Sequence, residues 1–537
     1  MPRNIQALEI VFLLLLLFVV IFGAVAQRLK LAYPIVLVIA GLLLSFVPGI
    51  PKFTLNPDVV FFVILPPLLY SAAWTTSWRE FSYNLVSICF LAFGLVTFTV
   101  LGVTETARWL FPGFDWRVGI VLGAVVAPTD TIAATSIARR IGLPKKIVDV
   151  LEGESLLNDA TALLALEFGL AILAGGHTPT FGAGLLRLIY LTVVGLAVGL
   201  AIGEVVHQVE HQIDDAPIEV ALSILTPYVA YLSANAIHAS GVLAVVSCGL
   251  YLRRKSSHFF SPNVRLQAWA VWDSFTFILN GLVFVLIGLQ LPYVMDALQE
   301  YSRYKLLQYG LGFSAFLILL RLVWLFPGAY VANVIRRRIL GQHEPMPTLR
   351  QLFVLGWTGM RGVISLAAAI ALPQMIAGKE FAQRDMIIFL AFSVILVTLV
   401  LQGMTLPPLI RKLGLAGIPI PDREEEDARR AILEAALNNL QQARATSNPD
   451  FAEIYDDLEQ HYRRRLAVLT GRGSDKRGIT DAAFHDQFVG LSRELLRVER
   501  HTAVQLRNER RISDELLLQL ERELELSEAH LATKARK

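Results

Sequence analysis

Residues 147–173 read IVDVLEGESLLNDATALLALEFGLAIL, an apolar run that carries five acidic side chains. About 20 mostly apolar residues are enough to cross the roughly 30 Å hydrocarbon core of a bilayer as a helix. A charge at the centre of a bilayer costs at least about 2.5–3.5 kcal/mol, so an acid in such a span needs a counter-charge, a cation or a proton. This stretch therefore predicts a membrane fold and marks where its function lies.

The rest of the chain has the same apolar character. Its 537 residues are 55% hydrophobic and 17% charged, whereas soluble chains carry about 25% charged residues. We expect an all-α polytopic membrane protein with thirteen transmembrane helices. The predicted spans lie near residues 8–26, 32–48, 57–74, 84–107, 117–137, 147–173, 183–206, 218–236, 239–252, 269–291, 307–333, 350–372 and 385–407. The two cysteines, Cys89 and Cys248, lie inside apolar runs, which argues against a disulfide framework or a zinc cluster.

Charge divides the chain into two domains. Residues 421–537 hold 43 Asp, Glu, Lys and Arg in 117 positions, with 20 basic and 23 acidic groups. We therefore predict a transmembrane domain of residues 1–418 and a helical tail of residues 419–537. Apolar positions at helical spacing, such as residues 516, 520 and 524, predict a hairpin or bundle packed on itself, with self-association or regulation as the alternative. The sequence does not identify a partner for the tail, and it lacks the dense basic face that nucleic acid requires.

Lys and Arg gather in alternate loops of the membrane domain. The loops around residues 139–146, 253–265 and 336–350 are rich in these residues, and the loops between them are poorer. Because loops rich in Lys and Arg stay in the cytoplasm, the N-terminus is expected outside and the tail inside the cell.

The densest polar cluster lies in the sixth predicted span. On a helix, residues four apart lie on the same face. Ser155 and Asp159 therefore share one face, and Glu154 and Asn158 share the neighbouring face. Carboxylate, hydroxyl and amide oxygens suit hard cations such as Na⁺ or Li⁺, and a carboxylate also binds H⁺, whereas a transition metal favours His or Cys. The cluster therefore predicts an ion or proton site.

The fifth predicted span is interrupted by Pro128, which is followed by Asp130. Proline removes a backbone donor and breaks the helix, which exposes a helix N-terminus inside the membrane. Asp130 can neutralise that positive helix end or take part in ion binding, and the sequence leaves both roles open.

The twelfth predicted span contains Gly359, Arg361 and Gly362. The glycines allow the helix to unwind, and the guanidinium of Arg361 can cap the carbonyl groups that unwinding exposes. Interrupted helices in two halves of a chain are typical of an inverted-repeat transporter whose site lies at mid-membrane.

Arg321 lies in an apolar span and must be paired. We predict Glu154 as its partner, because this pairing leaves Asp159 without a fixed counter-charge. Two further acids, Glu167 and Asp273, are expected near an aqueous funnel or an interface.

Six segments in this order resemble the monovalent cation:proton antiporter superfamily, in its branch of bacterial NhaP-type sodium/proton antiporters and animal sodium/hydrogen exchangers. The matching segments are residues 62–68, 127–130, 152–159, 240–246, Arg321 and residues 359–362. The resemblance implies a fold with two inverted repeats that works as a homodimer by an elevator-like movement. It also implies a dimerisation part of about residues 1–80 and 215–295 and a mobile core part of about residues 84–175 and 305–410.

The resemblance also implies roles for individual residues. Asp159 matches the family's ion-binding aspartate, with Thr129, Ser155 and Asn158 as polar companions and Asp130 as the other acid of the crossing helices. Asp159, Thr129 and Ser155 would hold the transported Na⁺, and Glu154 with Arg321 would form the family's internal salt bridge. In this family, asparagine at the position of Asn158 accompanies electroneutral exchange. Relatives often carry an acid after the Pro66-Pro67 pair, and this chain has none there.

These observations predict a secondary active sodium or lithium/proton antiporter of a bacterial inner membrane, which exchanges ions by alternating access for pH and sodium homeostasis. A potassium/proton antiporter with the same mechanism is the alternative. A cation channel fits less well, because the sequence indicates one focal site and no pore lined by rings of ligands. We expect neither enzymatic activity nor a cofactor, since the membrane part lacks a nucleotide-binding loop and a credible nucleophile–base pair.

Overall fold

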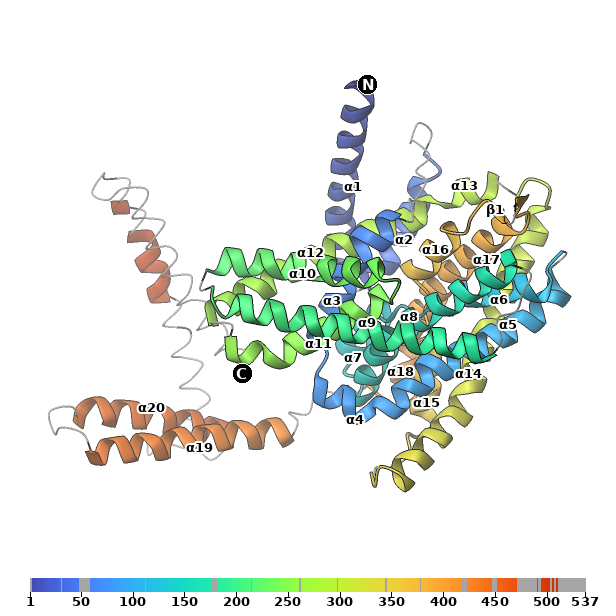
Figure 1. The fold of residues 1–537 in the computed structure, drawn as a ribbon. Coiled ribbons are helices and arrows are strands. Elements are labelled where there is room, and N and C mark those ends of the chain that lie inside the picture. The colour runs from blue at the N-terminus through green and yellow to red at the C-terminus, as the bar shows by residue number, and fades with distance from the viewer. Residues whose placement is uncertain are drawn as a thin grey trace. The chain divides into compact units, whose positions relative to one another are not determined.

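A computed structural model gives the fold of the chain (Figure 1). The described residues are 2–29, 31–47, 58–111, 113–175, 181–213, 215–259, 262–296, 298–342, 345–376, 378–416, 423–446, 452–470, 490, 494–502, 505–506 and 509. The chain divides into two compact units, Met1–Ile418 and Pro419–Lys537.

The first unit is built almost entirely of helices. Its α-helices are α1 (Pro2–Leu29), α2 (Tyr33–Leu44), α3 (Leu65–Thr75), α4 (Trp78–Cys89), α5 (Val96–Leu110), α6 (Trp116–Val126), α7 (Thr131–Ile141), α8 (Lys145–Gly175), α9 (Phe181–Glu210), α10 (Ala216–Ala236), α11 (Gly241–Phe259), α12 (Pro262–Leu289), α13 (Leu291–Asp296), α14 (Arg303–Arg338), α15 (Leu349–Trp357), α16 (Val363–Ile370), α17 (Arg384–Val397) and α18 (Gly403–Lys412). Three π-helical segments continue neighbouring helices: η1 (Val59–Ile64), η2 (Phe90–Leu95) and η3 (Thr398–Gln402). Two short antiparallel strands, β1 (Met375–Ile376) and β2 (Lys379–Glu380), pair Met375 with Glu380 and Ile376 with Lys379.

Many of these helices have the length and composition of membrane spans. In the described part of the chain, seven are long and apolar enough to cross a bilayer: Trp78–Leu110, Lys145–Gly175, Gly182–Glu210, Ala216–Ala236, Gln267–Leu289, Arg303–Arg338 and Arg384–Lys412. Shorter apolar helices occupy Leu13–Leu29, Tyr33–Leu44, Val59–Thr75 and Trp116–Val126. The predicted all-α membrane fold is therefore confirmed, and the number of thirteen spans stays a prediction.

The helices of the first unit form two groups. α9, α10, α11 and α12 gather on one side, where α2 packs on α12 and α3 packs on α11 (Figure 1). α5, α6, α14 and α17 gather on the other side, and α8 packs against α6 of this group (Figure 1). The two groups are joined through α3, which also contacts α8, and through α2, which also contacts α7 and η3.

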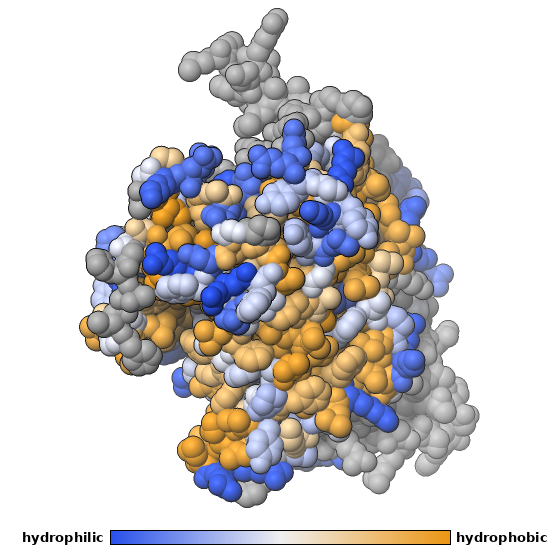
Figure 2. All heavy atoms as spheres, turned by 90° about the vertical axis from the view of Figure 1, so that its right-hand side faces the viewer, coloured by the Kyte–Doolittle hydropathy of each residue, from blue (hydrophilic) through white to orange (hydrophobic). Residues whose placement is uncertain are grey.

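Apolar side chains cover much of the outer surface. On α9, Leu186 is 70% exposed and Val193 is 58% exposed, although neither residue lies near a chain end. Figure 2 shows a broad apolar area on one face, with hydrophilic side chains toward its upper and lower edges. A soluble protein rarely exposes such continuous apolar area, whereas a bilayer requires it.

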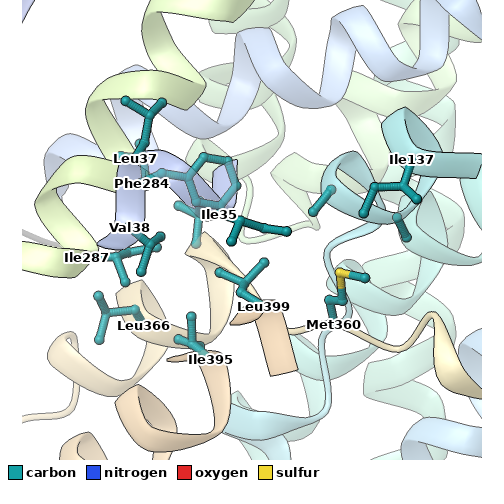
Figure 3. Packing of buried hydrophobic residues seen from close by; sticks show 14 of the residues in the cluster. Ile35, Leu37, Val38, Ile137, Phe284, Ile287, Met360, Leu366, Ile395 and Leu399 are labelled. Atoms are coloured by element: carbon teal, nitrogen blue, oxygen red, sulfur yellow. The ribbon is translucent and has the colours of Figure 1, made fainter. Parts of the chain in front are cut away.

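A large buried apolar cluster connects the two groups of helices. Ile35 and Val38 of α2 and Phe284 of α12 meet Leu366 of α16 and Leu399 of η3 (Figure 3). These side chains pack beside the interrupted segments described below, so the cluster supports the region that carries the polar residues.

The second unit contains α19 (Arg423–Thr446) and α20 (Ala452–Thr470), which pack against each other. Arg444 pairs with Asp456 at 2.7 Å and with Glu459 at 3.3 Å, and Arg463 pairs with Glu459 at 2.6 Å. The helical character predicted for the tail is confirmed here. The predicted apolar positions at residues 516, 520 and 524 lie outside the described residues.

The crossing of α2 and α12 generates a stability prediction. A Cβ atom on Gly41 would lie 2.4 Å from the carbonyl oxygen of Val285, which is backbone and cannot move aside. We expect Gly41→Ala to destabilise the protein by at least about 1–3 kcal/mol and to lower its melting temperature in detergent.

Gly312→Ala is the matched control, because a Cβ atom on Gly312 in α14 meets no atom within 4 Å. This substitution should leave the melting temperature unchanged or raise it slightly, since alanine favours a helix by about 0.5–1 kcal/mol. Equal melting temperatures for the two variants would contradict the close crossing.

Candidate functional site

Two interrupted helices cross in the interior of the first unit. α6 ends at Val126 and α7 begins at Thr131, while α15 ends at Trp357 and α16 begins at Val363. The two connecting segments touch, since the backbone N–H of Asp130 donates to the carbonyl of Met360 at 2.8 Å. Both interruptions fall where the sequence predicts them.

The local sequence explains each interruption. Pro128 lacks an N–H, so it cannot donate the hydrogen bond to the carbonyl of residue 124 that would continue α6. Gly362 allows the second segment to approach the first, because a Cβ atom there would lie 2.1 Å from a carboxylate oxygen of Asp130. Asp130 therefore lies at the start of α16, where a negative charge is favourable.

Arg361 caps the exposed carbonyl groups of both interruptions. It is 1% exposed, and its Nε donates to the carbonyl of Val126 at 3.1 Å. A terminal nitrogen of the same guanidinium donates to the carbonyl of Gly359 at 2.5 Å. The structure thus places Arg361 in the helix-end position that the sequence predicts.

Glu154 and Arg321 form a buried ion pair. The two guanidinium nitrogens of Arg321 donate to the two carboxylate oxygens of Glu154 at 2.5 and 2.8 Å, and the side chains are 1% and 0% exposed. Arg321 also donates to the carbonyl of Leu355 at 3.3 Å. This bidentate arrangement places a counter-charge directly on one of the two acids of the cluster in α8.

A hydrogen-bond network ties α8 to the segment before α7. Asn158 donates from its amide nitrogen to the hydroxyl of Thr129 at 2.5 Å, and that hydroxyl donates to Glu154 at 3.2 Å. Ser155 donates to the backbone carbonyl of Thr129 at 3.1 Å. The network fixes the oxygens of Ser155 and Thr129 beside α8.

Asp159 lies on α8 one helical turn beyond Ser155 and is 5% exposed. Among the described residues it makes no ion pair, because Arg321 binds Glu154 and Arg361 binds backbone carbonyls. A buried carboxylate without a counter-charge is stable only when it holds a proton or a cation. Asp159 is therefore the acid of the α8 cluster that is free to bind an exchangeable ion or proton in this arrangement.

A cavity of about 490 Å³ leads to this carboxylate. The residues that line it include Asp159, Ser155 and Thr129 as well as the ion pair of Arg139 with Glu152. Arg139 is 62% exposed in this pair, so the cavity connects Asp159 with the surface on the side of residues 139–146.

The two remaining acids take different places. Glu167 faces outward and pairs with the exposed Arg187 at 3.0 Å. Asp273 of α12 lines the cavity, together with Asn280 of the same helix and Tyr33 of α2. Sequence analysis did not single out Asn280 or Tyr33, although the seven-residue spacing of Asp273 and Asn280 in an apolar span was a readable signal.

The sequence of the chain matches a known family. The family of the transmembrane sodium/hydrogen exchangers matches residues 13–412. The chain belongs to this family. The resemblance noted in the sequence is thereby confirmed.

Members of the family resemble the chain over most of its length. An uncharacterized Na⁺/H⁺ exchanger of Mycobacterium tuberculosis is 32% identical over 527 residues, which is 97% of this chain and 96% of the relative. A sodium, potassium, lithium and rubidium/H⁺ antiporter of Bacillus pumilus is 32% identical over 81% of this chain and 65% of the relative.

A solved structure shares the fold. The sodium proton antiporter MjNhaP1 of Methanocaldococcus jannaschii has a TM-score of 0.57 and 18% identity, with 77% of this chain and all of that chain covered. At this level of identity the likeness supports the helical architecture and carries no information on individual site residues.

The buried ion pair generates a testable prediction about stability. Arg321→Met leaves the Glu154 carboxylate buried without a counter-charge, and Glu154→Gln leaves the guanidinium in the same state. We expect each single substitution to cost about 3–5 kcal/mol, and the double variant to recover much of that loss. Thermal unfolding of the four proteins in detergent measures the coupling. Strictly additive effects would show that the two side chains do not depend on each other.

Proposed function

We propose that this chain exchanges Na⁺ or Li⁺ for H⁺ across a membrane and that Asp159 binds either ion in turn. The observation that carries the proposal is the buried carboxylate of Asp159, which no described cation neutralises and which a cavity connects to the surface. The name of the family agrees with this activity.

The neighbouring oxygens support a cation at Asp159. Ser155 and Thr129 line the same cavity as this carboxylate, and hydrogen bonds hold both residues in place. Carboxylate and hydroxyl oxygens are suitable ligands for a hard alkali cation. Asn158 positions Thr129, and Asp130 lines the cavity while it lies at the start of α16.

Competition for one carboxylate explains why exchange is obligatory. A proton and a cation cannot occupy the same carboxylate at the same time, so loading one ion releases the other. An empty Asp159 would carry an unpaired negative charge through the membrane interior, which is strongly unfavourable. Only the loaded, neutral forms of the site therefore cross between the two sides of the membrane.

The ion pair of Glu154 with Arg321 contributes to a one-for-one exchange. Because this pair is neutral and fully buried, Asp159 is the one acid of the α8 cluster that changes its charge. Asn158, next to Asp159 in the chain, adds no charge. One proton then replaces one monovalent cation, and the exchange is electroneutral.

Alternating access requires two parts that move relative to each other. We assign the dimerisation part to about residues 1–80 and 215–295 and the mobile core part to about residues 84–175 and 305–410, with the homodimer as the working unit. The basic loops support an N-terminus outside and a tail of residues 419–537 in the cytoplasm of a bacterial cell. The cavity to Asp159 then opens toward the cytoplasm, because Arg139, which lines it, lies in the last turn of α7 at the start of one of these basic segments.

Potassium is the alternative cargo. The relative from Bacillus pumilus is named as an antiporter of sodium, potassium, lithium and rubidium, so potassium is among the cargoes named in the family. Comparing proton flux driven by Na⁺, Li⁺ and K⁺ in proteoliposomes decides between the two cargoes.

Asp159→Asn tests the central assignment. An amide cannot exchange a proton for a cation, so we expect cation-driven proton movement in proteoliposomes to disappear while the protein still folds. Glu167→Gln is the matched control, because Glu167 lies on the same helix and pairs with Arg187 at the surface. It should keep exchange near the level of the unmodified protein. Normal exchange by Asp159→Asn would refute the proposed function.

Electroneutrality generates a separate prediction. Moving one net charge through 100 mV changes the energy by about 2.3 kcal/mol, which would alter the rate of an electrogenic exchanger strongly. We expect the initial rate of Na⁺-driven proton flux to change by less than about twofold when a potential of this size is imposed. A steep dependence on the potential would indicate that more than one proton moves with each cation.

A further inference from the structure

A polar stripe on α12 faces the cavity that leads to Asp159. Asp273, Thr276 and Asn280 all line this cavity and are spaced three and seven residues apart, so they share one face of the helix. The stripe spans about 10 Å along the helix axis, since each residue adds about 1.5 Å. The remainder of this helix is mostly apolar, as a membrane span requires.

Asn280 is the innermost residue of the stripe. It is 5% exposed, and its side-chain oxygen has no hydrogen-bond partner. The hydroxyl of Tyr33, on α2, lies against the Asn280 side chain. A buried amide oxygen without a donor is costly, and a cation in the cavity is a ligand that removes this cost.

Asp273 marks the outer end of the stripe. Its side chain is exposed, and it lines both the main cavity and a smaller adjoining cavity that also contains Arg253 and Arg265. Thr276 lies between the two, and its hydroxyl donates to the carbonyl of Trp272 at 2.7 Å, which leaves the lone pairs of its oxygen available.

A second helix that lines the cavity has a similar arrangement. On α8, Glu152 and Asp159 are also seven residues apart and line the same cavity. Glu152 is neutralised by Arg139 at 2.5 Å, whereas Asp273 makes no ion pair among the described residues. A cation that enters therefore meets a carboxylate of α12 before it reaches Asp159.

We propose that Asp273, Thr276 and Asn280 form a second, weaker station for a monovalent metal cation on the α12 wall, from which the ion passes to Asp159. The station rests on the proposed function, because it supplies the cation that exchanges for the proton. It offers only oxygen ligands, as a hard cation requires. Its binding must be weak, since an ion that is held tightly at an intermediate site does not move on.

Substitutions that remove one oxygen each test the station in transport. Asp273→Asn, Thr276→Val and Asn280→Leu should each raise the Na⁺ concentration for half-maximal exchange by about five- to tenfold. The maximal rate at saturating Na⁺ should stay within about twofold, because Asp159 is untouched. Ser274→Ala is the matched control, since Ser274 lies on the same helix outside the cavity and its hydroxyl donates to the carbonyl of Ala270.

Binding measurements separate the station from the exchange site. In the Asp159→Asn background we expect weak binding of radioactive Na⁺ to the purified full-length protein, and this binding should disappear when Asp273→Asn is added. Melting temperatures show that each variant is folded. If Asn280→Leu fails to fold, Asp273→Asn and Thr276→Val still decide the outcome.

The two proposals fail in different ways. Unchanged half-maximal Na⁺ concentrations in the folded stripe variants, or no Na⁺ binding in the Asp159→Asn protein, overturn the station and leave the exchange site intact. Active exchange by Asp159→Asn overturns the proposed function itself.

Discussion

The membrane interior offers no water to a charged group, and this constraint governs the polar residues of the first unit. Glu154 and Arg321 satisfy it by pairing with each other, with both carboxylate oxygens in contact with the guanidinium. Because Arg321 is already occupied, it cannot neutralise Asp159. The fixed ion pair is thus the reason that a second carboxylate, that of Asp159 about one and a half turns farther along α8, is left without a counter-charge among the described residues.

The interrupted helices solve a related problem. Each interruption exposes backbone carbonyls and N–H groups inside the protein, where each unpaired group is costly. Arg361 donates to carbonyls of both segments, and Asp130 donates its backbone N–H to Met360. The surrounding apolar cluster of α2, α12, α16 and η3 excludes water from these contacts and makes them stronger (Figure 3). The polar crossing and the apolar cluster therefore depend on each other.

The helices α8 and α12 contribute different polar side chains to the cavity. The α8 wall carries Asp159, to which we assign the exchange of ions, and beside it Ser155 and Asn158 are hydrogen-bonded to Thr129. The α12 wall carries weaker ligands that an entering cation meets on the way. This chain has no acid in the residues that follow the Pro66-Pro67 pair. Two of those residues, Ser71 and Ala72, line the same cavity as Asp273, which supplies a carboxylate there.

The sequence by itself determined the membrane class, the interruptions at Pro128 and Gly362, and the cluster on α8. These features follow from local chemistry: apolar length, the missing N–H of proline, the small size of glycine, and residue spacing on one helix. It also pointed to Glu154 as the partner of Arg321, since a buried arginine requires an acid.

Only the tertiary structure decided which surfaces face the cavity. Tyr33 and Asn280 lie 247 positions apart in the chain, and their meeting near Asp159 depends on how α2, α12 and α8 pack. Spacing along one helix predicts which residues share a face, but it does not show which other helix that face meets, because that is set by packing between segments distant in sequence.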